Sequence, residues 1–240
     1  MLNLNPSVFI VDADASVRAS LEAVIRRAGW ASETFASAGA FLARRRLLAP
    51  SCLVLDIALP DLAGFDLLRG IAAKRQETPI IAMSGDDDIP TTVQAMKAGA
   101  VDFLVKPLAD DALLAGVRHA IARSRAVLTQ ITELLELRRR YDALTGRERE
   151  VMARVVAGQL NKQVGVALGI SEITVKAHRG KVMRKMGADS LAELVTMAMR
   201  LELPLSRVVT TPSAISPRHT YGIAGLTGHA LPLRALAAAR

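Results

Sequence analysis

The stretch VFIVDADASVR, residues 8–18, joins an apolar run to two acidic side chains and then to a helical pattern. Four apolar residues lead into Asp12, and Asp14 follows after a single alanine. From Val17 onward, apolar residues recur at helical spacing until Gly29, a residue well suited to end a helix. The stretch predicts a buried strand followed by a helix, with two carboxylates between them that a cation would stabilise.

The same strand-then-helix pattern occurs five times before residue 125. Because the runs are short and mostly apolar, and each is followed by a helix, they predict a parallel sheet covered on both faces. The fold class that follows is α/β, a doubly wound, flavodoxin-like domain with a five-stranded parallel sheet. The expected strands are Val8–Asp12, Ala31–Phe35, Cys52–Asp56, Pro79–Met83 and Val101–Val105, and the expected helices are Val17–Ala28, Ala38–Leu48, Phe65–Arg75, Thr91–Ala98 and Asp111–Arg123.

Charge is distributed unevenly along the chain of 240 residues. Residues 1–124 hold 13 basic and 14 acidic side chains, a net charge of −1, whereas residues 125–240 hold 18 and 9, a net charge of +9. A basic half is typical of proteins that bind a polyanion such as nucleic acid. We therefore expect two domains, of which the second contacts a polyanion.

The second half contains signals for four short helices between residues 144 and 203. Thr145 with Glu148, and Ser190 with Glu193, have the spacing of capping boxes, in which two side chains satisfy free backbone donors at a helix start. The second and third helices are expected at Asn161–Leu168 and Glu172–Met186, with a tight turn at GIS, residues 169–171.

Two further segments lie outside these domains. Residues 125–143 predict a connecting helix with an apolar stripe at Leu128, Ile131 and Leu135, which either pairs with a second copy or packs on its own domain. Residues 204–240 contain four arginines and no acid, and their composition predicts a disordered basic tail. The expected division is 1–124, 125–143, 144–203 and 204–240.

No apolar run approaches the ~18 residues of a membrane helix, and the N-terminus has no secretory signal pattern. The single cysteine, Cys52, lies in an apolar run and is expected to be a buried thiol in a reducing compartment. We therefore expect a cytoplasmic protein without a membrane partner.

Polar side chains follow four of the expected strands. Asp12 ends the first and Asp14 lies just beyond it, Asp56 ends the third, Ser84 follows the fourth, and Lys106 follows the fifth. Ligands of open α/β sheets bind beyond the carboxyl ends of the strands, so these side chains should meet at one edge. Hard oxygen ligands, a carboxylate nucleophile and a lysine suit Mg²⁺-assisted phosphoryl transfer to an aspartate.

Residues 6–124 resemble the receiver domain of a two-component response regulator, on the motifs VFIVDADASVR, CLVLDIALPDLAG, PIIAMSG and AMKAGAVDFLVKP. The resemblance implies that Asp56 accepts the phosphoryl group and that Ser84 is the switch hydroxyl. It further implies that Lys106 binds the phosphoryl group, with a cis peptide to Pro107. Phe103 would be the aromatic side chain that moves together with Ser84.

Ala13 departs from the receiver pattern, which has two adjacent acids at this point. The ligands that remain for Mg²⁺ are Asp12, Asp56 and the backbone carbonyl of Ala58, with Asp14 as a further candidate one residue along the turn. Removing one carboxylate from a hard-cation site should lower its affinity. We expect weakened Mg²⁺ binding and a phosphorylation site that is slowed by it.

Residues 144–198 resemble the LuxR-type helix-turn-helix of the FixJ/NarL group. Such a unit lays its second helix in the major groove of DNA. In that helix Val175, Val182 and Met186 share one face and should be buried. The opposite side carries Ile173, Lys176, Ala177, Gly180, Lys181 and Arg184. We expect Lys176 to contact a base, Ala177 and Gly180 to allow close approach, and phosphate contacts from Thr174, His178, Arg179, Lys181, Asn161 and Lys162.

The two resemblances together predict a response regulator that acts as a transcription regulator and is not an enzyme. They imply promoter DNA and a sensor histidine kinase as partners, and a homodimer upon phosphorylation. One alternative is a regulator whose receiver no longer depends on phosphorylation. Another is a Mg²⁺-dependent haloacid-dehalogenase-like phosphatase, in which Asp12 would be the nucleophile and Asp14 the acid/base.

Overall fold

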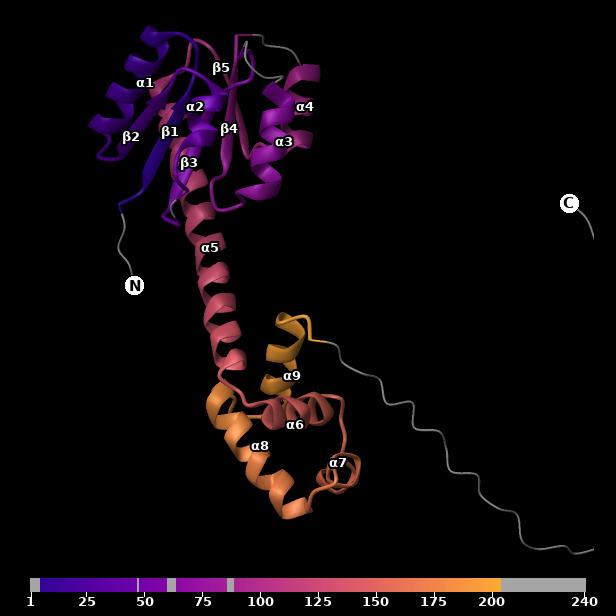
Figure 1. Cartoon of the computed structure of the whole chain (residues 1–240). Helices are drawn as coiled ribbons and strands as arrows, with labels where there is room; N and C mark the ends of the chain where they lie inside the picture. Colours follow the sequence, from indigo (N-terminus) through magenta and orange to yellow (C-terminus); the bar gives the residue numbers. More distant parts are fainter. Residues whose placement is uncertain (1–4, 47, 60–63, 86–88, 204–240) are drawn as a thin grey trace, which may run out of the picture. The chain divides into compact units, whose positions relative to one another are not determined.

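A computed structural model describes residues 5–46, 48–59, 64–85 and 89–203 of the chain. The N-terminal part is a five-stranded parallel sheet in the order β2-β1-β3-β4-β5 (Figure 1). This is the doubly wound order expected from the sequence. The expected tail, residues 204–240, lies outside the described residues. The strands are β1 (Ser7–Val11), β2 (Ala31–Phe35), β3 (Ser51–Asp56), β4 (Ile80–Ser84) and β5 (Asp102–Val105).

Helices cover both faces of the sheet, because the central strands are apolar on both sides (Figure 1). Phe9 and Val11 of β1 pack toward α2, α3 and α4, whereas Val8 and Ile10 pack toward α1 and α5. Successive residues of a strand point to opposite faces, so one apolar run serves two cores. The helices are α1 (Ala15–Arg27), α2 (Ala38–Ala43), α3 (Gly64–Lys74), α4 (Ile89–Ala98) and α5 (Asp110–Asp142).

Helix α2 is shorter than the sequence predicts, since it ends at Ala43 and not at Leu48. Arg44 leaves the helical conformation, with φ −62° and ψ 136°. Its guanidinium lies 4.3 Å from the centre of the Phe9 ring and forms a 2.6 Å ion pair with Glu33. These contacts hold Arg44 against β1 and β2 and end the helix.

Helix α5 runs without a break through residue 124, where the sequence suggested that one helix ends and a connecting helix begins. Ser124 is buried at this point, accepts a hydrogen bond from the backbone N–H of Ser51 at 3.0 Å, and donates one to the carbonyl of Glu77. Beyond it, Leu128 and Ile131 are half-buried and Leu135 is exposed. The boundaries of the connecting segment and the role of its apolar stripe stay predictions.

The C-terminal described part is a helical domain with a core of its own. The capping box expected at Thr145 and Glu148 is present. The one expected at Ser190 and Glu193 is only half formed: Ser190 accepts from the N–H of Glu193, but Glu193 accepts from the N–H of Asp189. The helices are α6 (Gly146–Val156), α7 (Asn161–Leu168), α8 (Glu172–Met186) and α9 (Leu191–Arg200).

None of the helices in the described ranges is both long enough and apolar enough to cross a membrane.

Glu148 links the start of α6 to α8 in this domain. Its buried carboxylate accepts a 2.6 Å hydrogen bond from Lys185 and a 2.9 Å bond from the backbone N–H of Thr145. These two bonds, the one from Lys185 above all, lower the pKa of Glu148 from 4.5 to about 2. The stabilisation from this carboxylate is thus complete above pH 4.5 and is lost as the pH falls toward 2.

We expect Glu148→Gln to lower the free energy of unfolding at pH 7 by about 1 kcal/mol, because the cap and its ion pair are weakened. Between pH 5 and pH 2 the wild type should lose more stability than this variant. Thermal melts of the full chain across this range would measure the difference. Glu150→Gln, which alters an exposed pair with Arg147, is the matched control. Parallel pH profiles for wild type and Glu148→Gln would contradict the assignment.

Candidate functional site

The carboxyl ends of four strands bring the expected polar side chains to one edge of the sheet. Asp12 follows β1, Asp56 ends β3, Ser84 ends β4, and Lys106 follows β5. Asp12, Asp56 and Ser84 are only 1%, 7% and 2% exposed. The peptide between Lys106 and Pro107 is cis, as the receiver resemblance implied.

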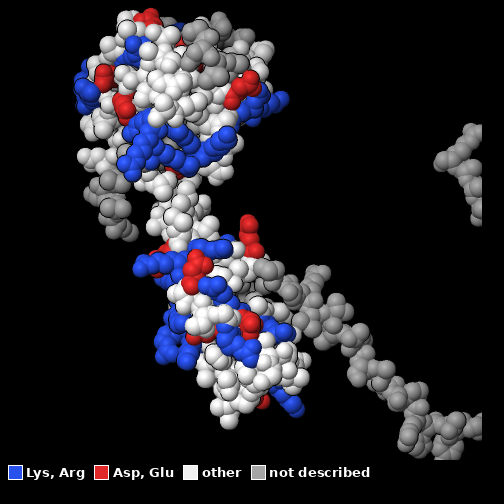
Figure 2. Space-filling model, viewed as in Figure 1, with Lys and Arg blue, Asp and Glu red and all other residues white. Residues whose placement is uncertain are grey.

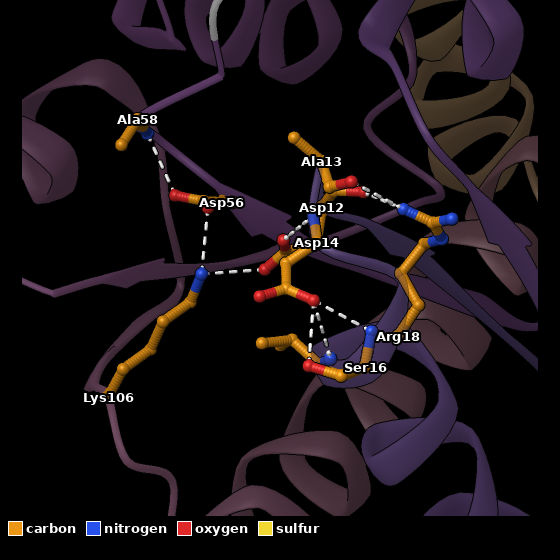
Figure 3. Close-up of polar contacts among 9 residues, drawn as sticks. Asp12, Ala13, Asp14, Ser16, Arg18, Asp56, Ala58 and Lys106 are labelled. Carbon is orange, nitrogen blue, oxygen red and sulfur yellow. Dashed lines mark hydrogen bonds and ion pairs between the residues drawn. The ribbon is translucent and has the colours of Figure 1, made fainter.

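The ammonium group of Lys106 lies between the two buried carboxylates (Figure 3). Its Nζ atom is 2.6 Å from Oδ2 of Asp12 and 2.7 Å from Oδ2 of Asp56. Burial disfavours the charged ammonium, but the hydrogen bonds to Asp12 and Asp56 outweigh this and raise the pKa of Lys106. Lys106 therefore stays a cation, and it holds together two acids that would otherwise repel each other.

Each of the two carboxylates uses its other oxygen to accept a backbone hydrogen bond. Oδ1 of Asp12 accepts from the N–H of Asp14, and Oδ1 of Asp56 accepts from the N–H of Ala58, both at 2.8 Å. These bonds fix the loops that follow β1 and β3 and orient both carboxylates toward Lys106. The backbone of Ala58 is thereby held beside Asp56 (Figure 3).

Asp14 caps helix α1. Its Oδ1 atom accepts hydrogen bonds from the hydroxyl and the backbone N–H of Ser16, both at 2.7 Å, and from the N–H of Val17 at 3.5 Å. The hydrogen bond from the Ser16 hydroxyl is the largest cause of the lowered pKa of Asp14. One oxygen of this carboxylate is thus engaged with the helix start, which limits its use as a replacement metal ligand.

Arg18 also contributes to this loop, and sequence reasoning missed it. Its Nη1 atom donates to the backbone carbonyls of Asp12 at 2.7 Å and of Ala13 at 2.9 Å. The guanidinium holds the loop from the side away from Asp56 (Figure 3). The only signal in the sequence is an arginine in the first turn of the helix, and backbone carbonyls leave no pattern by which its target could be recognised.

The oxygen atoms at this edge are of the kind that binds Mg²⁺, but they are few. Carboxylate and carbonyl oxygens are the ligands that Mg²⁺ prefers, and Asp12, Asp56 and the Ala58 carbonyl could hold it. Ala13 has no donor in its side chain. Within the described ranges, no three His, Cys, Asp or Glu side chains come together in a group able to hold a metal ion.

Ser84 ends β4, the strand next to the one that ends in Asp56, and Phe103 lies on β5, one strand further along the sheet. The backbone carbonyl of Ser84 accepts from the N–H of Lys106 at 2.8 Å, which ties the end of β4 to the residue after β5. Phe103 is half-buried in β5 and packs against the core that α2, α3 and α4 form on the sheet. Ser84 therefore borders the site and is directly connected to Lys106 through the backbone, whereas the described contacts of Phe103 are with the apolar core.

Helices α7 and α8 form the expected pair around the turn at Gly169, whose φ of 65° is in the left-handed region that favours glycine. Val175, Val182 and Met186 of α8 are buried, as expected. The residues expected at the DNA interface fall into two groups. Lys162, Lys176, Ala177, Gly180 and Lys181 are exposed, and Asn161, Thr174, His178 and Arg179 are half-buried.

Two of these side chains contact each other, and a third contacts a neighbour on its own helix. Arg179 donates from Nη1 to Oδ1 of Asn161 at 3.3 Å and so connects α8 to α7. Nζ of Lys176 lies 3.8 Å from Oε1 of Glu172, one turn earlier. The Nδ1 atom of His178 is buried and has no hydrogen-bond partner among the described residues. Lys176, the side chain expected to contact a base, is thus held only by an exposed ion pair of 3.8 Å.

Comparison with protein families gives two matches. Residues 8–118 match the response regulator receiver domain, and residues 142–198 match the luxR family of bacterial regulatory proteins. The two matches identify a regulator and not a phosphatase, so the haloacid-dehalogenase alternative is wrong. The family comprises transcription regulators and not enzymes.

Similar proteins combine the same two parts. The response regulator protein TodT of Pseudomonas putida is 39% identical over 195 residues, which span 81% of this chain and 86% of TodT. The transcriptional regulatory protein FixJ of Bradyrhizobium diazoefficiens is 39% identical over 193 residues, 80% of this chain and 94% of FixJ. The solved structure of the response regulator StyR matches with a TM-score of 0.70 and 39% identity, over 82% of this chain and 100% of StyR. The chain therefore belongs to the response regulators of the FixJ and TodT family, two-component proteins that join a receiver domain to a LuxR-type DNA-binding helix-turn-helix domain.

Proposed function

We propose that this regulator binds promoter DNA under the control of phosphorylation at Asp56, and that Ala13 weakens the Mg²⁺ binding on which phosphorylation depends. The observation that carries the proposal is the pair of hydrogen bonds from Lys106 to Asp12 and Asp56. A buried carboxylate beside a lysine and a serine is the arrangement that accepting and stabilising a phosphoryl group requires.

In the proposed reaction, a carboxylate oxygen of Asp56 attacks the phosphorus of a phosphohistidine on the partner kinase. The new P–O bond forms as the P–N bond to that histidine breaks. Lys106 then donates to phosphoryl oxygens in place of the carboxylate, and the hydroxyl of Ser84 can donate to another. A bound Mg²⁺ would neutralise part of the charge on the transferring group. Asp12, Asp56 and the Ala58 carbonyl are the groups that would hold it.

Ala13 sets this site apart from receivers with two adjacent acids. The nearest replacement is Asp14, but one of its oxygens caps α1. Changes in the immediate surroundings of a metal commonly cost 10- to 100-fold in affinity, so the loss of a ligand should cost at least about tenfold. We therefore expect phosphorylation to be slow and to need more Mg²⁺, with the acceptor itself intact.

A second function is favoured by the same observation. Lys106 forms ion pairs with both Asp12 and Asp56, so the protein itself compensates part of the charge of the two acids. A receiver in this state could regulate DNA binding without phosphorylation, through contacts with another protein or with a second copy. The two functions differ in whether Asp56 is labelled at all.

The proposed DNA interface consists of α8 and the start of α7. Lys176 would reach a guanine edge, and Ala177 and Gly180 would let the helix approach the bases. Thr174, His178, Arg179, Lys181, Asn161 and Lys162 would hold phosphates and set the register. We further propose that the protein works in the cytoplasm, where it meets its kinase and promoter DNA, and that it forms a homodimer through its receiver domain on phosphorylation.

Phosphate-affinity gels of the full chain with acetyl phosphate and Mg²⁺ would test the acceptor. Wild type should be labelled, Ala13→Asp should be labelled about tenfold faster because a ligand is restored, and Asp56→Asn should not be labelled. Asp66→Asn, an exposed acid on α3, is the matched control. Label retained in Asp56→Asn would show that the acceptor is elsewhere. Label in Ala13→Asp alone would favour the phosphorylation-independent function.

Binding to duplex DNA selected from a random pool would test the two classes of contact. Lys176→Ala should lower affinity for the selected site by about 1–3 kcal/mol and relax the preference at one position. Lys181→Ala should weaken binding to selected and random duplexes alike and reduce the slope of log K against log salt by about one. Lys74→Ala, an exposed lysine on α3, is the control. Equal effects of the two α8 variants would remove the distinction.

A further inference from the structure

The outermost line of α8 is apolar over its first half. Ile173, Ala177, Gly180 and Arg184 follow one another at intervals of four, three and four residues, so they lie on one line along the helix. All four are exposed, and this line is opposite the buried face of the helix. In the view of Figure 2, the surface over the N-terminal part of α8 is mostly uncharged.

The fold does not account for this composition. Ile173 is 80% exposed and belongs to no apolar core among the described residues. At Gly180, a Cβ atom would meet nothing within 4 Å, so the helical domain does not require a glycine there. Glycine within a helix is less stable than alanine. Both residues are thus better explained by a molecule that lies close to this line than by the packing of the domain.

The flanking charges point to DNA as that molecule. Lys176 and Lys181 lie on either side of the line, and Arg184 continues it. An exposed isoleucine between cations fits a groove with an anionic rim and one apolar feature on its floor. In the major groove the apolar feature of the base edges is the 5-methyl group of thymine.

We propose that Ile173 is a specificity-determining residue that contacts a thymine methyl group, with Ala177 beside it on the same line. The inference rests on the proposed DNA interface and adds to it a base preference that Lys176 does not supply. Half-sites should then contain a thymine at the position read by the first turn of α8, next to the base that Lys176 contacts.

The test uses the full chain and a site selected from a random duplex pool. Each thymine of the selected site is replaced in turn by uracil, which lacks only the methyl group. Wild type should lose about fourfold in affinity at one thymine of each half-site, the value of one buried methyl group. Ile173→Ser should bind the thymine and uracil versions equally, and Ile173→Val should keep the difference. Val166→Ser on α7, also 80% exposed, is the matched control and should behave as wild type.

The outcomes separate this inference from the function on which it rests. If no site is enriched, the proposed DNA interface is wrong and the inference falls with it. If a site is enriched but every uracil replacement is neutral, or Ile173→Ser keeps the full sensitivity, only the inference is overturned. In that second case Ile173 does not contact a thymine methyl group, and Ile173→Ser should bind the selected site as wild type does.

Discussion

The ammonium group of Lys106 is the contact on which the proposed phosphorylation site depends. It lies between Asp12 and Asp56, two buried acids that would repel each other without it. The three residues belong to the ends of β1, β3 and β5, so the order and register of the sheet bring them together. Because each acid also accepts a backbone hydrogen bond two residues further on, the loops are fixed together with the charges. Phosphorylation of Asp56 would change one hydrogen-bond partner of Lys106. The change would thereby affect the strands that end at these two residues.

The sheet and the site could be predicted because their signals are local. Apolar runs that end in Asp12 and Asp56 mark strand ends, and parallel strands place such ends at one edge. The features that were missed depend on contacts between distant residues. Arg18 binds backbone carbonyls, α2 ends where Arg44 turns to Phe9 and Glu33, and Ser124 holds an unbroken α5 against β3. The carboxylate of Glu193 accepts from the N–H of Asp189 and not from that of Ser190. Sequence spacing cannot resolve this difference of one residue.

The receiver and the helix-turn-helix domain differ in how closely their residues follow the pattern of their families. The receiver keeps the aspartate proposed as the acceptor, the lysine and the serine, but it has Ala13 where a second acid is expected, and Asp14 is engaged in capping α1. The helix-turn-helix keeps its buried face and exposed lysines, and it adds an exposed isoleucine that the fold does not need. The proposed DNA-binding surface thus retains the residues expected of it, whereas the proposed metal site has an alanine where receivers have a second adjacent acid. From this contrast we propose that metal binding, and not DNA binding, limits the regulation of this protein.

The affinity of the full-length protein for Mg²⁺, measured by titration calorimetry, tests this account most directly. Wild type, Ala13→Asp and Asp14→Asn should be compared, since asparagine can still cap α1. The account predicts that Ala13→Asp binds Mg²⁺ at least about tenfold more tightly than wild type and that Asp14→Asn binds as wild type does. Equal affinities for wild type and Ala13→Asp, with a loss of binding in Asp14→Asn, would show that Asp14 supplies the third carboxylate and would contradict it.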